Sequence, residues 1–437
     1  MSSTLTFPDV FVNASDALNR DSINTTSPWL LAFRERQLQQ LKQLSLPTRK
    51  TEDWRYSFRH LKMSDAIAKP LPALSTLAES SLDESLIDLG GYLVVFVNGH
   101  FSEDKSRLPS DGSCTIKRFS ELSDEEAKQL GESVSSDTSA LPFATINGAC
   151  LTDGVYISIP KNIKVEKTIQ LHFHAEGEGT TTPRVFLIAE QGSEATLVEE
   201  FSGSTQTELL TASVTDIQLN AQAELRYIRL NTEAEQLSHI GLTQVNQNRD
   251  SRFKSFCMGL GGPVRRHDLK IKLLEPGAEC QLDGVCITLG QQHYDNHTEV
   301  EHISAHCQSD ESYRCIAGGS SHIVFNGRIM IHRDAQKTLG AMSNKNLLLT
   351  SKAEIDSKPE LEIYADDVKC AHGTTIGQLD EEELYYLVTR GISPDHAATI
   401  LTLGFVNELV QKIPNESIKE RTEARLESLI KSAFQED

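Results

Sequence analysis

The sequence predicts a mainly β protein with helical segments at both ends of the chain. Apolar residues at helical spacing are confined to residues 1–90 and 380–437, whereas short β-rich runs separated by turns fill residues 91–365. Within the β-rich part, one turn pattern recurs at nearly constant intervals. Such a period is typical of a solenoid, in which each repeat forms one coil that stacks on the coil before it.

Residues 1–90 are predicted to form an N-terminal helical domain. The stretch PWLLAFRERQLQQLKQL indicates a helix with Ser27 as its N-cap and Pro28 at its first position. The apolar residues at helical spacing in this stretch are Trp29, Leu30, Phe33, Leu38, Leu41 and Leu44. The stretch PLPALSTLAESSLDES, at residues 70–85, indicates a linker.

Residues 91–378 are predicted to form the β-rich region, with regular coils from about residue 150. Its β-rich runs include GYLVVFVNG, TIQLHFHA and HIVFNGRIMIH. The repeated turn pattern starts at Gly192, Asn220, Asn248 and Gly277, at intervals of 28, 28 and 29 residues. A small residue in each repeat suits the tight corner of a coil. A β-sandwich with chance similarity among its turns is the alternative.

Residues 379–437 are predicted to form a C-terminal helical domain. The stretch DEEELYYLVTRG carries three acids in its first turn, where the helix dipole favours them. A second helix should start with Ser393 as N-cap and Pro394 at its first position. Its predicted apolar stripe consists of Ala397, Ile400, Leu401, Phe405, Leu409 and Ile413. These helices could pack as a cap on the β core or form a docking hairpin for another protein.

Composition excludes several classes of function. The formal net charge of -20 argues against a nucleic-acid partner, because phosphate binding needs clustered Lys and Arg. We expect no transmembrane helix, since no run of 18 apolar residues occurs. The N-terminal stretch lacks the basic and apolar regions of a signal peptide, so we expect a cytoplasmic protein. The eight cysteines include no CxxC pair, which favours buried thiols or isolated ligands over disulfides.

Sequence motifs of common enzyme classes are absent, including the P-loop, G-x-S-x-G, H-E-x-x-H and G-x-G-x-x-G. A carbohydrate-active β-helix enzyme stays an alternative. Such an enzyme needs paired carboxylates and aromatic platforms, but aromatic residues make up only 6% of the chain.

Four histidines gather in the stretch QQHYDNHTEVEHISAHC, namely His293, His297, His302 and His306. On a strand, His293 and His297 would share one face and His302 and His306 the other. Imidazoles are common ligands of transition metals, so a self-contained metal site is one interpretation. Structural histidines in a polar β region are the other.

Cys370 and His372 are two residues apart in the stretch DDVKCAHGTTIG, so they share one face of an extended segment. Thiolate and imidazole together suit zinc, copper or an iron–sulfur centre. Two ligands do not complete such a site, so others must come from elsewhere in the chain or from another chain. A catalytic Cys–His dyad and a simple turn before a helix are the alternatives.

Five long stretches resemble the SufB/SufD family of the Suf iron–sulfur cluster assembly machinery. They match in order over most of the chain and are LPTRKTEDWRY from Leu46, VVFVNGHFSEDKSRLP from Val94, DNHTEVEH from Asp295, VFNGRIMIHRDAQKT from Val324 and KPELEIYADDVKCAHGTTIGQLDEEELYYLVTRGIS from Lys358. The KCAHG motif has the form of the SufD branch, whereas SufB-like chains carry an EHEA-type pattern before the RGIS helix.

The resemblance implies a right-handed parallel β-helix flanked by N-terminal and C-terminal helical domains. It also implies a non-catalytic scaffold that pairs with its paralogue SufB through the end of the β-helix. The ATPase SufC would bind the C-terminal helices and supply the ATP hydrolysis. The two scaffold chains would share a transient iron–sulfur cluster and contribute to iron acquisition. A reduced flavin is a further candidate in the complex. The isolated chain is expected to hold no cofactor and could form a homodimer.

The resemblance also assigns roles to residues. His372 should serve the cluster at the interface with SufB, and Cys370 is the weaker candidate. The residues expected to contact SufC are Asp380, Leu384, Leu387, Arg390, Ile392, Ile400, Phe405 and Leu409.

Overall fold

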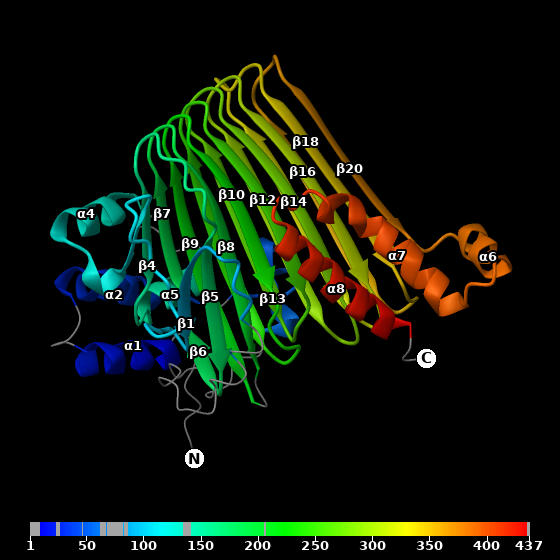
Figure 1. Ribbon diagram of the computed structural model, residues 1–437, viewed down its shortest axis with the longest axis horizontal. Coiled ribbons are helices and arrows are strands. Elements are labelled where there is room, and N and C mark those ends of the chain that lie inside the picture. Colours follow the sequence, from blue (N-terminus) through cyan, green and yellow to red (C-terminus); the bar gives the residue numbers. More distant parts are fainter. Residues whose placement is uncertain are drawn as a thin grey trace.

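A computed structural model describes residues 9–22, 27–45, 47–61, 67, 82, 86–133, 141–204 and 207–434. Two β-sheets face each other along an elongated parallel solenoid of about eight turns, with helices at its N-terminal end and along one side (Figure 1). The predicted fold class is confirmed. The β-sandwich alternative is wrong, because from β5 onward the paired strands run parallel, each to the strand of the next coil.

The chain alternates between the two sheets, here called sheet A and sheet B. The strand order of sheet B is β2-β1-β5-β8-β10-β12-β14-β16-β18-β20, and that of sheet A is β19-β17-β15-β13-β11-β9-β7-β4-β3, with β6 beside β9. The strands of sheet B are β1 (Tyr92–Val97), β2 (His100–Phe101), β5 (Ile169–Glu176), β8 (Glu194–Ser204), β10 (Glu224–Asn231), β12 (Arg252–Leu260), β14 (Glu279–Thr288), β16 (Gln308–Ala317), β18 (Leu339–Leu348) and β20 (Lys369–Gly377). The strands of sheet A are β3 (Thr115–Arg118), β4 (Val155–Ile159), β6 (Gly179–Thr181), β7 (Arg184–Ala189), β9 (Leu209–Leu219), β11 (Ser238–Gln247), β13 (Arg265–Leu273), β15 (His293–His302), β17 (His322–Ile331) and β19 (Glu354–Ile363).

The predicted repeat corresponds to the turns that precede the sheet B strands. In seven successive turns of this type one residue has a positive φ, and these residues are Asn162, Gly192, Gln222, Asp250, Gly277, His306 and Lys337. The turns stack by backbone hydrogen bonds; for example, the Gly192 amide donates to the Ala221 carbonyl and the Gln222 amide donates to the Arg249 carbonyl. Glycine adopts this conformation without strain, but only Gly192 and Gly277 of these seven residues are glycines.

The main core lies between the two sheets, because alternate side chains of each strand point inward. On β10 these are Leu225, Tyr227 and Arg229, so the run ELRYIRLN alternates inward and outward residues. In-register pairing stacks Leu225 on Phe253, and both are fully buried. Each new coil therefore removes one further layer of apolar side chains from water.

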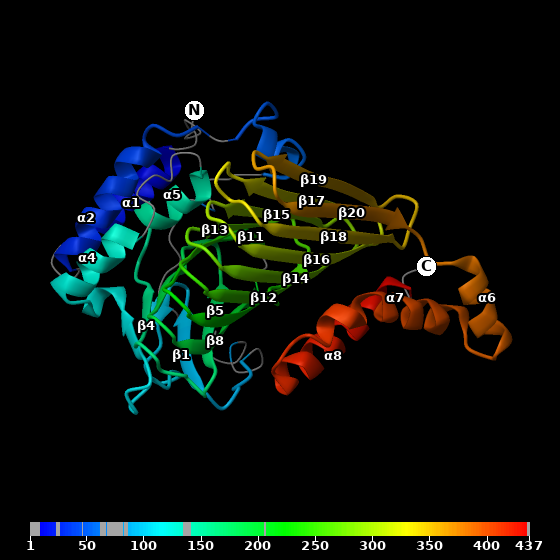
Figure 2. The same cartoon turned by 90° about the horizontal axis from the view of Figure 1, so that it is seen from above.

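The N-terminal helices cover the outer face of sheet A near the first coils (Figure 2). They are α1 (Asp9–Ser22), α2 (Pro28–Leu41), α4 (Asp124–Ser133) and α5 (Pro142–Ala149), with the short 3-10 segments η1 (Glu52–Trp54), η2 (Phe58–His60) and η4 (Phe119–Glu121). Ser27 and Pro28 start α2 as predicted. The linker predicted at residues 70–85 lies outside the described residues apart from Leu82.

Helices α4 and α5 lie within the stretch that the sequence pattern predicts as β-rich. All eight residues of α5 are buried, so this helix has no polar face and shows no amphipathic period. The predicted boundaries at residues 90 and 378 stay predictions.

The C-terminal helices are α6 (Glu381–Thr389), α7 (Pro394–Val410) and α8 (Glu416–Ala433). Helices α7 and α8 pack on the outer face of sheet B, where Val406 and Leu426 join a cluster with Phe256 and Val285. Helix α6 projects beyond the solenoid (Figure 1). None of the described helices is both long and apolar enough to cross a lipid bilayer.

One carboxylic acid lies deep in the core. Glu311, on β16, is fully buried between the layers of Leu282 and Met342, and its Oε2 accepts a hydrogen bond of 2.6 Å from Thr298 Oγ1. Burial raises the pKa of Glu311 to about 7, against the opposing effect of the Thr298 hydrogen bond. This side chain therefore changes charge near neutral pH.

The pKa of Glu311 predicts a pH-dependent stability. Because its folded-state pKa lies above its ordinary value, its contribution is fully present below about pH 4.5 and is lost as the pH rises through about 7. We expect Glu311→Gln to match the wild type at about pH 4 and to exceed its free energy of unfolding by about 3 kcal/mol at pH 8 or above. Urea denaturation at both pH values measures this difference, with the exposed Glu166→Gln as control. An equal difference at both pH values would contradict the assignment.

Candidate functional site

The two ends of the solenoid differ. At the first coil the outer strands β2 and β3 pair antiparallel with β1 and β4, and helices cover the adjacent surface. At the last coil β19 and β20 end the two sheets, and all seven residues of β20 after Cys370 are exposed. The last coil therefore offers the hydrogen-bonding groups of a strand edge to solvent or to another chain.

Cys370 and His372 lie on β20 in register with Gly340 and Met342 of β18. Met342 points into the core, so the strand alternation places both Cys370 and His372 on the inward face of the last coil. Cys370 packs partly against the core, and this partial burial raises the pKa of its thiol. His372 is exposed. A thiol with a raised pKa is a poorer metal ligand in the free chain than an exposed imidazole.

Polar contacts also form at Thr374, which lies on the same face of β20 two residues after His372. Thr374 Oγ1 lies 2.9 Å from Ser357 Oγ of β19, and Ser357 Oγ donates to Asn344 Oδ1 at 2.8 Å. Asn346 Nδ2 donates to Asn344 Oδ1 at 2.6 Å and to the Thr375 carbonyl at 2.9 Å. These bonds join β18, β19 and β20, so the face that carries His372 is held in place without a partner chain.

Apolar side chains are unusually exposed around this end of the molecule. Of the eleven exposed large apolar side chains among the described residues, eight lie between residues 339 and 400. Those of the last coils are Leu339, Ile363, Tyr364 and Ile376. An exposed apolar rim around a strand edge is typical of a protein interface.

The possible metal-binding groups of the described residues do not include the predicted pair. Sets of His, Cys, Asp or Glu side chains close enough to share one ion occur twice, and neither contains Cys370 or His372. Further ligands for a metal at Cys370 and His372 therefore have to come from outside the described part of the chain.

The residues predicted to contact SufC lie in different environments on the C-terminal helices. Asp380 caps α6, accepting hydrogen bonds from the amides of Glu382 and Glu383. Arg390 is exposed and lies over the ring of Tyr386, and Ile400 is also exposed. The half-buried members are Leu384, Leu387, Ile392 and Phe405. Leu409 is buried on sheet B, which leaves it no surface to offer while α7 stays packed there.

The most exposed apolar residues of α6 cannot be identified from its sequence pattern. Tyr385 and Tyr386 are 71% and 57% exposed, and Val388 is exposed beside them. The sequence alone gives no signal for these residues, because a half-apolar nine-residue helix does not show which side faces solvent. Together with Ile400 they make α6 and the start of α7 the second exposed apolar surface.

The four histidines of the predicted cluster do not come together. His293 and His297 share the outward face of β15, as predicted, whereas His302 points inward and bonds to Ser309 Oγ at 2.9 Å. His306 leaves the strand because it occupies a turn with positive φ. His297 pairs with Asp295 at 2.8 Å. His293 instead lies beside two histidines from other parts of the chain, His60 and His322.

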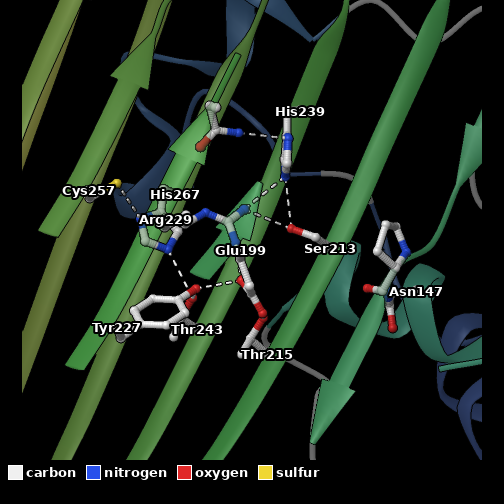
Figure 3. Close-up of polar contacts among 12 residues, drawn as sticks. Asn147, Glu199, Ser213, Thr215, Tyr227, Arg229, His239, Thr243, Cys257 and His267 are labelled. Atoms are coloured by element: carbon white, nitrogen blue, oxygen red, sulfur yellow. Dashed lines mark hydrogen bonds and ion pairs between the residues drawn. The ribbon is translucent and has the colours of Figure 1, made fainter. Parts of the chain in front are cut away.

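A charged network fills the interior between β8, β10 and sheet A (Figure 3). Arg229 Nη1 pairs with Glu199 Oε2 at 3.1 Å, and Arg229 Nη2 lies 3.0 Å from both Ser213 Oγ and His239 Nε2. Tyr227 donates to Glu199 Oε2 at 2.6 Å, and Thr215 donates to Oε1 at 2.7 Å. Removing either Glu199 or Arg229 would leave the other buried charge without its partner, which costs about 3–5 kcal/mol.

This network was missed in the sequence, although one signal for it exists. Arg229 follows Leu225 and Tyr227 at intervals of two residues, so strand alternation alone places a charged residue on the inward face. Its partner Glu199 lies one coil earlier, where β8 and β10 pair in register. The contacts of both groups within the network indicate a structural role, since they fix the register of successive coils.

Comparison with known proteins places the chain among iron–sulfur cluster assembly proteins. Residues 172–405 match the family model of the SufBD core domain of the SUF system for FeS cluster assembly, and residues 1–171 match that of the SufBD protein N-terminal region. An iron–sulfur cluster assembly SufBD family protein of Synechocystis is 29% identical over 87% of each chain. A chloroplastic protein of Arabidopsis thaliana is 28% identical over 97% of this chain and 92% of its own. The iron–sulfur cluster assembly protein SufD of Escherichia coli is 28% identical over 90% of this chain and 91% of its own.

Proposed function

Because the chain belongs to the SufBD family of iron–sulfur cluster assembly proteins, we propose that it is a SufD-type scaffold subunit. One observation carries the proposal. Cys370 and His372 face inward on the last strand of a solenoid whose end is uncovered and rimmed by apolar side chains. This arrangement is half of a ligand set at an interface, and the other half comes from a partner chain.

The partner at the last coil is the paralogue SufB. A chain with the same fold presents a similar final coil, so its edge strands can pair with β20 and β19 through backbone hydrogen bonds. The exposed Ile363, Tyr364 and Ile376 are covered in the process. The same edge accounts for a homodimer of the isolated chain, because two copies can satisfy each other's backbone groups.

The iron–sulfur cluster is the cargo of this interface and not a permanent part of the chain. Imidazole is a borderline ligand and thiolate a soft one, so a cluster held partly by His372 exchanges more readily than one held by cysteines alone. Closure of the two chains over the cluster excludes water and oxygen. In this role the chain positions ligands and performs no catalytic step, which leaves ATP hydrolysis to SufC.

Helix α6 is the proposed docking site for SufC. Its exposed Tyr385, Tyr386 and Val388 form an apolar surface next to Arg390, the composition expected of an interface centre. Only residues 378–380 connect the end of β20 to the start of α6. A movement of α6 driven by ATP binding in SufC would therefore act directly on the strand that carries His372.

The SufBD family membership argues against a carbohydrate-active β-helix enzyme. The cytoplasmic location and the flavin in the assembled complex stay predictions.

Replacing His372 tests the cluster site. Co-expression of His372→Ala with SufB and SufC should give an intact complex, because this exposed side chain makes no contribution to the core. Cluster yield after anaerobic reconstitution, measured by absorption and by iron and sulfide content, should fall at least about tenfold. Cys370→Ala should cause a smaller loss, and Thr375→Ala, which is exposed on the opposite face of β20, none. A wild-type yield from His372→Ala would refute the role of His372.

Introducing negative charge on the exposed face of α6 tests the proposed SufC-binding surface. The double variant Tyr385→Glu and Tyr386→Glu should fold normally, since both side chains are largely exposed. Its affinity for SufC should drop at least about 30-fold, as expected when aromatic anchors of an interface are lost. Glu420→Arg, an exposed site on α8, serves as the control in the same calorimetric titration. Equal affinities of the double variant and the wild type would place SufC elsewhere.

A further inference from the structure

Three histidines from distant parts of the chain meet on the outer side of sheet A. His60 ends η2, whereas His293 and His322 begin the neighbouring strands β15 and β17. The rings of His60 and His293 stack with centroids 4.0 Å apart, and the centroid of His322 lies 4.9 Å from that of His293. One ring nitrogen of each histidine lies within 4.8 Å of the corresponding nitrogens of the other two.

Two carboxylates extend this group along the sheet. Asp356 and Glu354 begin β19, the next strand, and form a second set of closely spaced ligand atoms that shares His322. Asp356 Oδ2 lies 2.8 Å from His322 Nε2. Three imidazoles are thus available as ligands, and Asp356 contacts one of them from the adjacent strand.

We propose that His60, His293 and His322 bind one divalent transition-metal ion of the zinc and ferrous class, with Asp356 holding the His322 ring through its hydrogen bond. Imidazole-rich sets select such ions over calcium and magnesium, which prefer sets made of oxygen ligands only. The site lies within a single chain, unlike the shared interface at His372. It departs from the sequence-based expectation that the isolated chain holds no cofactor.

The hydrogen bonds of His293 leave one ring nitrogen free for an ion. Asp295 pairs with Arg266 at 2.9 Å and therefore acts as a carboxylate that only accepts. Ser57 donates its hydroxyl hydrogen to Asp295, so its oxygen accepts from His293 Nε2 at 2.8 Å. Nε2 then carries the proton, and Nδ1 has a lone pair that is buried without a hydrogen-bond partner among the described residues.

This chain of bonds is the outer shell that metal-ligating histidines usually have. A ligand histidine typically donates its second ring nitrogen to a carboxylate, a carbonyl or a water, which fixes the tautomer and the ring orientation. Here the donation runs from His293 through Ser57 to Asp295.

The cationic side chain of Arg59 already contacts two of the proposed ligands, His60 and His322. Arg59 Nη2 lies 3.3 Å from His322 Nδ1 and 3.7 Å from Glu354 Oε2, and Arg59 Nε donates to His60 Nε2 at 3.1 Å. The Arg59 side chain is 64% exposed, so it can turn into solvent when an ion takes its place. The guanidinium thus occupies two of the three proposed ligands, His60 and His322, which a divalent cation would bind in its place.

An ion in this position would add a further link between parts of the molecule that Ser57 and Arg59 already connect. It would tie the N-terminal segment around η2, which lies beside β17 and β19 (Figure 2), to β15 and β17 and, through Asp356, to β19. One of these strands, β19, belongs to the last coil. Bound metal would therefore stabilise the N-terminal segment and the coil that ends the solenoid together.

Metal titration of the full-length chain, purified with a chelator and then dialysed, tests the proposal. Co²⁺ serves as the spectroscopic probe, with Zn²⁺ and, under anaerobic conditions, Fe²⁺ in parallel calorimetric titrations. We expect one ion per chain, visible ligand-field bands from Co²⁺, and a metal-dependent rise in the melting temperature. His60→Ala and the isosteric Asp356→Asn should each weaken binding at least about tenfold and abolish the rise. Neither residue is fully buried, so both variants should fold.

Two control variants separate this site from the others. His332→Gln removes a histidine that follows β17 and pairs with Glu301 of β15, outside the proposed site. His372→Ala removes the predicted cluster ligand. Both should bind Co²⁺ like the wild type. Absence of binding by the wild type, unchanged binding by His60→Ala, or loss of binding in His372→Ala would each overturn the proposal. Because the role of His372 is measured by cluster yield in the complex, either proposal can fail alone.

Discussion

Backbone pairing between successive coils is the constraint on which the rest of this structure depends. Each parallel strand satisfies its amide and carbonyl groups with the strand one coil away, so the stack has to end at two strands with one open edge each. The N-terminal end is closed by antiparallel strands and helices, whereas β19 and β20 end the other side. The predicted ligands Cys370 and His372 lie on β20, which the fold leaves with one open edge. The proposed partner binding and the proposed cluster site thus share one feature of the solenoid.

The interior imposes a second constraint, because polar groups between the sheets need partners in the next coil. The Glu199–Arg229 pair satisfies this requirement across the β8–β10 register, and Glu311 does so only in part through Thr298. A shift of one coil against the next would separate such groups and expose apolar layers. The ordered stack in turn keeps the face of β20 rigid, since Asn344 and Asn346 of β18 bond to Ser357 and Thr375. The last coil is therefore ordered by contacts within the chain itself.

The sequence predicts features that depend on local pattern and misses those that depend on pairing. The Ser27-Pro28 and Asp380 helix starts and the turns at Gly192 and Gly277 were correctly placed, because capping and tight turns act over a few residues. Helix α5 was missed because every residue in it is buried, and the turn at His306 because it does not repeat the residue pattern of the four predicted turns. The approach of His60 to His293 has no local signal, since it requires the N-terminal segment to fold back over sheet A. Spacing alone brought Cys370 and His372 to attention, but the open edge around them appears only once the coils are stacked.

The most direct test of this account is amide hydrogen exchange of residues 369–377 in the free chain and in its complex with SufB. In the free chain the outward-facing amides of β20 should exchange fast, as expected for a strand with one open edge. In the complex the same amides should become protected, together with those of β19, while the N-terminal coils remain unchanged. Exchange of β20 that is equally fast with and without SufB would contradict the claim that a second chain completes the last coil.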